Sequence, residues 1–381
     1  MATETNKDTE KLLAKIAKNS KIIIYGTAEA AIYLKRVIEE KRKDIKILSF
    51  VNTYESGEID GIPVIKPNAL AALASGVDVA IIASIYYADT MKFILSIFGI
   101  KKYLKITPKI LDISFKFKPC NIPQELIQKA RGVFDILDSD KDRQLYKMAL
   151  DYRTYKDMIS LPNYHKKTNK HFVFDYPQKH YFEFIKKSKI KTVLDIGAYD
   201  CTHSLLFLAK FPNVKKVYAF EPLYETFKKD FLDELIKPNN NKIEIIKKAV
   251  WDKEEVLEFQ QHKYETCSKL VKIAPPTEDT VNVIKVQTIS VDKFAQQHPG
   301  MKADYIKMDI EGAEQNALKG AIKTIQKDRP QMAISIYHTP QDFVEIPLYL
   351  HKNLKDYVFK LGHYCPNAAE TVLYCIPKEL F

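Results

Sequence analysis

The sequence is poor in cysteine and arginine, and it has no long apolar run. Five cysteines occur among 381 residues without Cys-x-x-Cys spacing, which argues against a disulfide framework or a zinc site and is typical of free thiols in a reducing compartment. No segment reaches the ~18 consecutive apolar residues of a membrane-spanning helix, and the first residues lack the apolar core of a secretory signal. We therefore expect a soluble, cytoplasmic protein without a membrane span.

The positive charge comes almost entirely from lysine. The formal net charge is +11, yet only six of the 59 basic residues are arginine, the side chain that binds phosphates and guanine edges in a bidentate manner. The lysines are spread along the chain, often beside acids, so the charge indicates solvated helix faces. We expect no nucleic-acid partner.

The composition is that of a globular protein, with 46% hydrophobic and 28% charged residues. The length predicts two or three domains. We expect an α/β protein in which two Rossmann-like parallel-sheet domains are joined by a helical linker. The predicted boundaries are 1–115 for the first Rossmann-like domain, 116–185 for the helical linker and 186–381 for the second Rossmann-like domain.

The first domain is predicted from a strand–helix–strand pattern. Apolar runs at 21–26, 45–51 and 77–84 flank a helical pattern at 28–40. A dinucleotide fingerprint would need three glycines, but those positions read Gly26, Ala28 and Ala31, and Asn52 replaces the acid expected for a ribose. We interpret this domain as a structural or dimerising module that supports a homo-oligomer, with a small ligand or NAD as the alternatives.

The linker is predicted to be helical over 124–156, after the prolines Pro119 and Pro123. A stretch at 164–182 is then rich in tyrosine, phenylalanine and histidine, which includes His180 and Tyr181. Such side chains stack on sugars or bases, or they form a packed connector across the next domain. Both interpretations stay open.

In the second domain, polar residues follow predicted parallel strands. Strand 191–195 leads into a turn with Gly197, strand 217–221 ends at Glu221, and strand 303–308 is followed by Asp309. Carboxyl ends of parallel strands form ligand sites. A further helix at 315–326 and a strand at 330–338 complete the pattern.

The turn predicts a nucleoside without a diphosphate. It has one close-approach glycine and an extra acid, Asp200, which disfavours a pyrophosphate. S-adenosylmethionine (SAM) fits, because Glu221 can accept from both ribose hydroxyls, Asp195 can take the methionyl ammonium and Val250 can contact the adenine. The predicted cofactor residues are Asp195, Gly197, Ala198, Tyr199, Asp200, Glu221, Pro222, Ala249, Val250 and Asp309.

Residues 193–376 resemble the FkbM-type family of SAM-dependent O-methyltransferases. The resemblance rests on the turn at 195–200, on Phe-Glu-Pro at 220–222 and on Asp-Ile-Glu-Gly-Ala-Glu at 309–314. It implies a class I SAM-dependent methyltransferase fold and transfer of a methyl group to a hydroxyl of a sugar or glycan-type substrate. One position departs from the family pattern, since Cys201 replaces the usual glycine. The first domain is similar to the N-terminal domain of some bacterial sugar-modifying transferases.

Methyl transfer to a hydroxyl needs a proton acceptor or a metal. We predict His338 as the base, because imidazole titrates near neutrality. Asp309 and Glu311, two residues apart, would project to one side of a continuing strand. They would orient His338 or, together with it, hold a divalent metal through oxygen ligands.

Two other functions stay open. The charge leaves an RNA methyltransferase as one alternative, although the sequence has no Asn/Asp-Pro-Pro-aromatic motif for amino groups. Cys201 leaves an inactive nucleotide-sugar-binding or assembly module as the other.

Overall fold

The structure, a computed structural model, forms two compact units. One comprises residues 1–116 and 171–178, and the other comprises 117–170 and 179–381. Each encloses a hydrophobic core of its own. The described residues are 7–27, 29–53, 56–84, 88–106, 122–154, 160–161, 179–227, 230–239, 241–262, 268–273, 275–276, 280–365 and 368–381.

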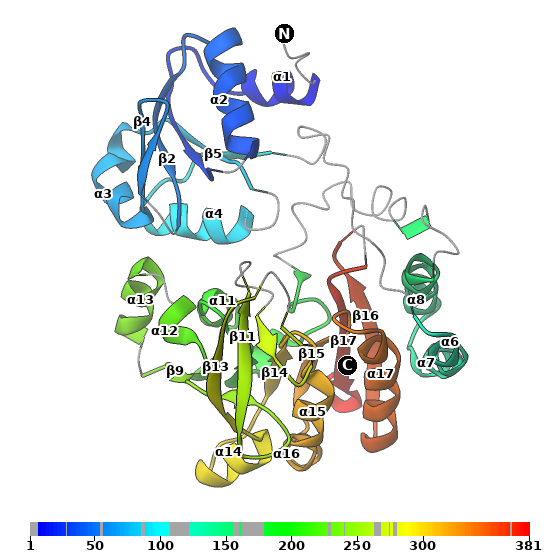
Figure 1. The fold of residues 1–381 in the computed structure, drawn as a ribbon. Coiled ribbons are helices and arrows are strands. Elements are labelled where there is room, and N and C mark those ends of the chain that lie inside the picture. The colour runs from blue at the N-terminus through cyan, green and yellow to red at the C-terminus, as the bar shows by residue number, and fades with distance from the viewer. Residues whose placement is uncertain are drawn as a thin grey trace. The chain divides into compact units, whose positions relative to one another are not determined.

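The first unit is a mostly parallel sheet flanked by helices (Figure 1). The sheet has the order β3-β4-β2-β1-β5-β6, in which only the β3–β4 pair is antiparallel. The strands are β1 (Lys21–Tyr25), β2 (Lys46–Val51), β3 (Gly57–Ile59), β4 (Ile62–Ile65), β5 (Val79–Ile82) and β6 (Tyr103–Lys105). The helices are α1 (Lys7–Leu13), α2 (Glu29–Lys41), α3 (Leu70–Leu73) and α4 (Ala88–Ile97). The predicted Rossmann-like pattern is therefore present.

The carboxyl ends of β1 and β2 are joined by neutral side chains. The Asn52 amide donates to the Thr27 hydroxyl at 2.7 Å, so the residue that replaces the ribose-binding acid is used within the fold. Gly26 has φ +124° and lies close to Ala83. Ala28, the second fingerprint position, lies outside the described residues.

The second unit is built on a seven-stranded sheet. Its order is β16-β17-β15-β14-β7-β8-β9, and only β17 runs antiparallel to its neighbours. The strands are β7 (Thr192–Ile196), β8 (Lys216–Phe220), β9 (Ile243–Ile246), β14 (Tyr305–Met308), β15 (Gln331–Ser335), β16 (Tyr357–His363) and β17 (Thr371–Pro377). Since β7, β8 and β14 are parallel neighbours, their carboxyl ends lie at one edge of the sheet.

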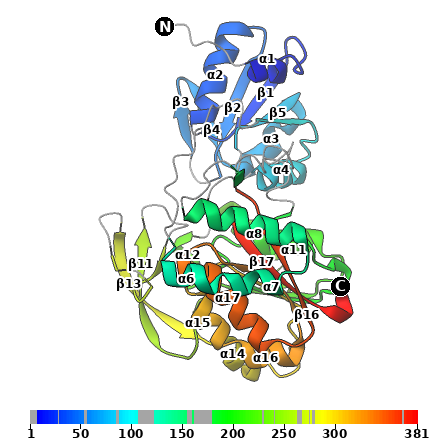
Figure 2. The same cartoon turned by 90° about the vertical axis from the view of Figure 1, so that its right-hand side faces the viewer.

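Helices cover this sheet, and those of the predicted linker belong to its core. The helices are α6 (Gln124–Lys129), α7 (Arg131–Ile136), α8 (Asp140–Arg153), α11 (Thr202–Lys210), α12 (Tyr224–Phe227), α13 (Asp230–Ile236), α14 (Val291–Gln297), α15 (Glu314–Lys319), α16 (Ile322–Asp328) and α17 (Pro340–Asn353). Helices α6 and α7 pack against α17, while α8 packs against β16 (Figure 2). Among the helices that the structure describes, none is both long and apolar enough to cross a membrane.

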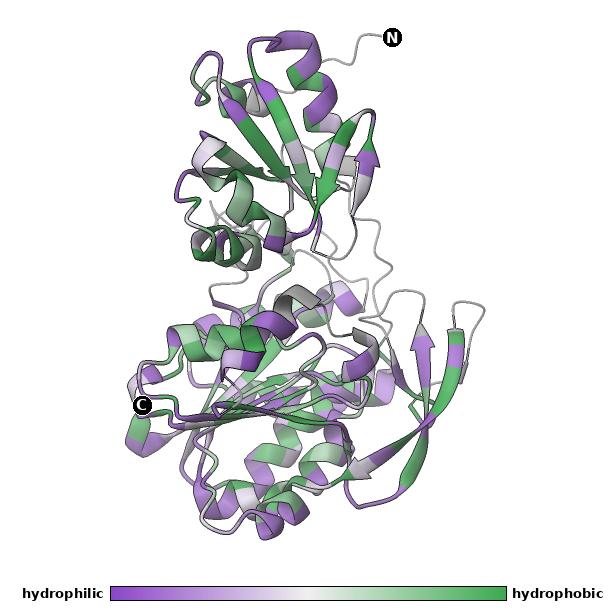
Figure 3. Ribbon diagram, turned by 90° about the vertical axis from the view of Figure 1, so that its left-hand side faces the viewer, coloured by the Kyte–Doolittle hydropathy of each residue, from purple (hydrophilic) through white to green (hydrophobic). Residues whose placement is uncertain are grey.

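A small second sheet extends from the main one in the order β10-β13-β11-β12. Its strands are β10 (Ala249–Val250), β11 (Val256–His262), β12 (Lys269–Leu270) and β13 (Thr280–Ile289). The predicted elements did not include this sheet. Figure 3 shows that the central strands of each unit are mainly hydrophobic, whereas the helices carry hydrophilic outer faces.

One predicted strand ends earlier than expected, and another does not continue beyond its predicted end. Strand β15 stops at Ser335, so His338 lies in the loop before α17. Strand β14 stops at Met308, and Glu311 has φ +57°. The expected strand alternation of Asp309 and Glu311 is therefore wrong, although both side chains approach His338.

Candidate active site

The turn after β7 depends on a glycine. Gly197 has φ +78°, and a Cβ there would lie 1.8 Å from the carbonyl oxygen of Asp309. A side chain would therefore clash with the backbone that directly follows β14. The next residue, Ala198, is buried and donates its N–H to the Phe220 carbonyl.

Beneath the turn lies a buried ion pair. Asp195 is fully buried, and its carboxylate accepts from the Ser204 hydroxyl at 2.7 Å and lies 3.3 Å from the Lys307 ammonium. Lys307 also donates to the carbonyls of Ile196 and Gly197. Burial raises the pKa of Asp195, while the charge of Lys307 opposes that rise. Asp195 therefore anchors the turn, and its predicted contact with a methionyl ammonium stays a prediction.

Glu221 follows β8 as a buried carboxylate. One oxygen accepts the Tyr199 N–H at 3.1 Å and the other accepts the Leu223 N–H at 3.0 Å. Burial raises the pKa of Glu221 to about 7, because two backbone donors only partly replace water. Each oxygen keeps a further acceptor position for a ligand hydroxyl.

The other predicted cofactor residues lie at the same edge or in the adjoining strand. Asp200 is buried and accepts the Thr202 N–H at 3.0 Å, and Pro222 is half-buried directly after Glu221. Ala249 and Val250 form the buried strand β10.

Cys201 occupies a position that suits glycine. It precedes α11 with φ +63°, in the left-handed region, and its side chain is fully buried. Burial, and then the charges of neighbouring acids, raise the pKa of the thiol well above its ordinary value. The three cysteines that the structure describes are all free and buried.

Asp309, directly after β14, is held by a tyrosine. Its carboxylate accepts the Tyr181 hydroxyl at 2.7 Å, and that hydroxyl also lies 3.1 Å from Ser335. Burial alone would raise the pKa of Asp309, but contact with His338 lowers it below its ordinary value. Asp309 is therefore a stable anion.

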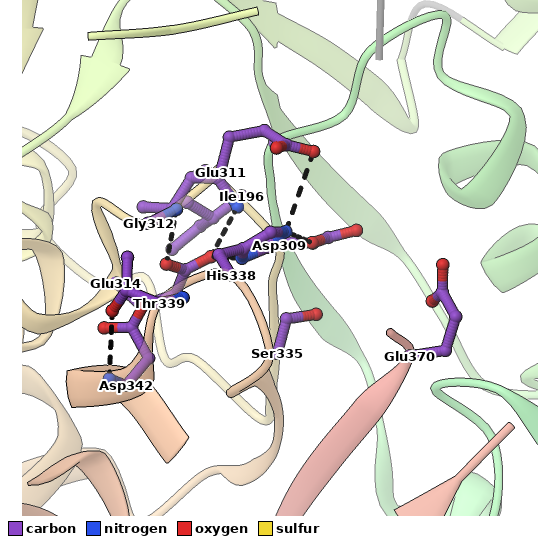
Figure 4. Close-up of polar contacts among 12 residues, drawn as sticks. Ile196, Asp309, Glu311, Gly312, Glu314, Ser335, His338, Thr339, Asp342 and Glu370 are labelled. Carbon is purple, nitrogen blue, oxygen red and sulfur yellow. Dashed lines mark hydrogen bonds and ion pairs between the residues drawn. The ribbon is translucent and has the colours of Figure 1, made fainter. Parts of the chain in front are cut away.

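His338 lies among three carboxylates (Figure 4). Its Nε2 lies 3.2 Å from Asp309 and 3.6 Å from Glu311, and its Nδ1 lies 3.0 Å from Glu314. Burial alone would lower the pKa of His338, but the charges of Glu314 and Glu311 raise it well above its ordinary value. These carboxylates favour the protonated imidazole, and the role of His338 as a base stays a prediction.

The predicted metal ligands do gather around His338. Asp309, Glu314 and His338 each offer a ligand atom within 4.8 Å of the others, so Glu314 takes the place predicted for Glu311. Both Glu314 oxygens already accept backbone N–H groups, from Ile310 at 2.8 Å and Gly312 at 2.9 Å. The imidazolium balances the carboxylates, and a metal here stays a prediction.

The sequence interpretation missed several residues of this site. Lys307 lies inside an apolar strand. Its position there could have indicated a buried ion pair, because a buried lysine needs a partner of opposite charge. His203 follows the turn in the first turn of α11, and its ring lies edge-on to Tyr181 with centroids 5.2 Å apart. His180, which the sequence analysis had named in the aromatic stretch, contacts Glu370 at 3.2 Å. Residues 164–178 of the aromatic stretch lie outside the described residues.

The sheet order, the glycine turn and the acid after the second strand define a Rossmann-like methyltransferase domain. Residues 195–361 match the family described as methyltransferase FkbM domain. This similarity covers residues 195–361, which all lie in the second unit.

Among the solved structures that resemble this chain, the first one described here supports the fold. Methyltransferase FkbM from Methylobacillus flagellatus KT aligns with a TM-score of 0.51 and 19% identity, over 97% of this chain and 93% of that chain. SAM-bound fibrillarin from Aeropyrum pernix aligns with a TM-score of 0.32 and 11% identity, over 54% and 74%. A Podospora anserina methyltransferase with bound S-adenosylhomocysteine (SAH) aligns with a TM-score of 0.31 and 9% identity, over 69% of this chain and 99% of that chain. No curated protein matches the chain in sequence.

Proposed function

We propose that this chain is a SAM-dependent O-methyltransferase that methylates a hydroxyl of a sugar or glycan-type substrate. The observation that carries the cofactor assignment is Glu221, a buried carboxylate beside the glycine turn whose two oxygens are held by backbone N–H groups. A ribose diol supplies two hydroxyls to such a carboxylate. The buried strand β10, which contains Val250, supplies an apolar neighbour for the adenine.

The acceptor assignment is supported by what surrounds Asp309. The hydroxyl of Tyr181 bonds to Asp309, the ring of Tyr337 lies 4.1 Å from that of His338, and Glu370 lies beside His180. Aromatic faces suit the apolar face of a sugar ring, and the polar groups suit its hydroxyls. Methyl transfer in this proposal requires the acceptor oxygen to lie in line with the SAM methyl group.

The proposal is tested by calorimetric titration of SAM into the purified chain and into Glu221→Ala. Each charge-assisted hydrogen bond is worth ~1.5–3 kcal/mol, so we expect the affinity of the variant to fall at least about tenfold.

The matched control is Glu234→Ala, which removes an exposed glutamate of α13 and should bind SAM as the unmodified chain does. Absence of SAM binding to the unmodified chain would overturn the cofactor assignment. Equal affinity of Glu221→Ala would remove Glu221 from the cofactor site.

A further inference from the structure

The order of the strands leaves one part of the sheet edge for the acceptor. In the proposed function, Glu221 after β8 holds the ribose of SAM, and the Gly197 turn after β7 faces its methionine part. The strands next to β7 are β14, β15 and then β17. With the cofactor over β8 and β7, the acceptor therefore meets the ends of β14 and β15 and the start of the antiparallel β17.

We infer that Glu370, directly before β17, binds a hydroxyl or ammonium group of the acceptor, so that the site takes a neutral or amino sugar and not a uronic acid. This inference rests on the proposed function. The Ile336 N–H, just after β15, donates to the carbonyl of Thr371 at 3.0 Å. Glu370 thus lies at the same edge of the sheet as Asp309, and in Figure 4 it lies on the far side of Ser335 from Glu314.

Two aromatic side chains connect Glu370 to Asp309. The Glu370 carboxylate lies 3.2 Å from the Nε2 atom of His180, and the ring of His180 packs against that of Tyr181 with centroids 3.8 Å apart. The Tyr181 hydroxyl donates to Asp309 at 2.7 Å. Both Glu370 and His180 lie outside residues 195–361, so the family match does not assign them.

The Glu370 carboxylate keeps its capacity to accept hydrogen bonds. Among the described residues, no lysine or arginine forms an ion pair with it, and no donor is hydrogen-bonded to it. Its Oε2 is buried, and this atom and the Nε2 of His180 are not aligned for a hydrogen bond. A buried carboxylate oxygen without a donor is costly. A ligand O–H or N–H removes that cost, whereas a ligand carboxylate is repelled by the like charge.

The backbone around Glu370 is fixed on both sides. Glu370 has φ +58°, in the left-handed region that residues with a side chain seldom adopt. Arg153, the last residue of α8, donates to the carbonyl of Ala368 and to the hydroxyl of Thr371, the latter at 3.0 Å. The Tyr364 N–H donates to the carbonyl of Glu370 at 3.0 Å. Such an uncommon conformation persists where its surroundings impose it, as they often do at ligand sites.

The test uses Glu370→Gln in the 381-residue chain, with Glu234→Gln, at an exposed glutamate of α13, as the matched control. SAH release is measured with methyl glycosides of neutral and amino sugars and with the matching methyl uronosides. We expect KM of Glu370→Gln for the glycosides to rise at least about tenfold, because a charge-assisted hydrogen bond is lost. Its kcat should stay within about twofold, as expected for a group that only binds the acceptor.

The SAM affinity of Glu370→Gln should equal that of the unmodified chain by calorimetry, which also shows that the variant is folded. The control should match the unmodified chain in every value. A kcat/KM of Glu370→Gln above half of the unmodified value would overturn the inference.

A second measurement needs neither turnover nor a variant. Saturation-transfer NMR on the unmodified chain with SAH should show that the neutral or amino glycosides bind at least about tenfold more tightly than the matching uronosides. Equal or tighter binding of the uronosides would overturn the inference, and so would a chain that binds SAM but none of the glycosides. Absence of SAM binding to the unmodified chain would instead contradict the proposed function.

Discussion

At the scale of single residues, the site depends on charges that are buried in pairs. Asp195 and Lys307 are almost fully buried, 3.3 Å apart, and lie under the turn of Gly197. A buried pair adds little net stability, but a single buried charge without its partner is costly. The pair is therefore best understood as a means of holding the turn in one conformation.

Lys307→Met should lower the free energy of unfolding by about 3–5 kcal/mol, because it leaves Asp195 buried without a counter-charge. Urea unfolding measures this value. The double variant Lys307→Met with Asp195→Asn should recover part of the loss, and the exposed-residue control Lys323→Met should change little. A loss below about 1 kcal/mol in Lys307→Met would show that Asp195 does not depend on this lysine.

At the scale of elements, α8 belongs to the methyltransferase core. Asp142 closes the capping box of α8 with Ser139. The same buried carboxylate accepts the Leu361 N–H at 3.0 Å and lies 3.2 Å from the Lys360 ammonium. One side chain thus completes the cap at the N-terminus of α8 and joins this helix to β16.

Asp142→Ala should lower the free energy of unfolding of the second unit by roughly 2–3 kcal/mol, since it removes the cap and leaves a buried N–H without an acceptor. Chemical unfolding followed by circular dichroism measures the change. Asp140→Ala, at a neighbouring side chain that is 99% exposed, is the control. Equal stability of the two variants would mean that α8 is only loosely attached.

At the scale of the whole molecule, buried acids make stability and cofactor binding depend on pH in opposite ways. Burial raises the pKa of Glu221 to about 7 and that of Asp342 to about 6. Both values exceed those of the unfolded chain. The folded chain thus binds these protons more tightly, so this contribution to stability is full below about pH 4 and is lost as pH rises through 6 and 7.

We therefore expect the free energy of unfolding without ligand to fall between pH 5.5 and 8, by about 1.4 kcal/mol per unit of pKa shift at most. SAM affinity should rise over the same range, because the ionised form of Glu221 accepts from the ribose. Urea unfolding and calorimetry at both pH values measure these two trends. A free energy of unfolding that increases toward pH 8 would contradict the assignment. So would a pH dependence that stays the same in the double variant Asp342→Asn with Glu221→Gln.

Several features were predictable because they are local. Alternating apolar runs and turns predicted the parallel strands, and an acid directly after a strand marked Glu221 and Asp309, since neighbouring parallel strands bring their carboxyl ends together. Gly197 could be found in the same way, because a tight turn between packed strands needs a residue without a side chain.

The tertiary structure alone decided which charges surround each of these groups. The sequence determined that His338 follows a strand near the cofactor edge, but not that Glu314, 24 residues earlier, approaches its Nδ1 at 3.0 Å. Likewise, the ring contact between His203 and Tyr181 comes only from the fold. The reason is physical, since protonation depends on distances between charges and on burial, and both come from contacts between segments far apart in the chain.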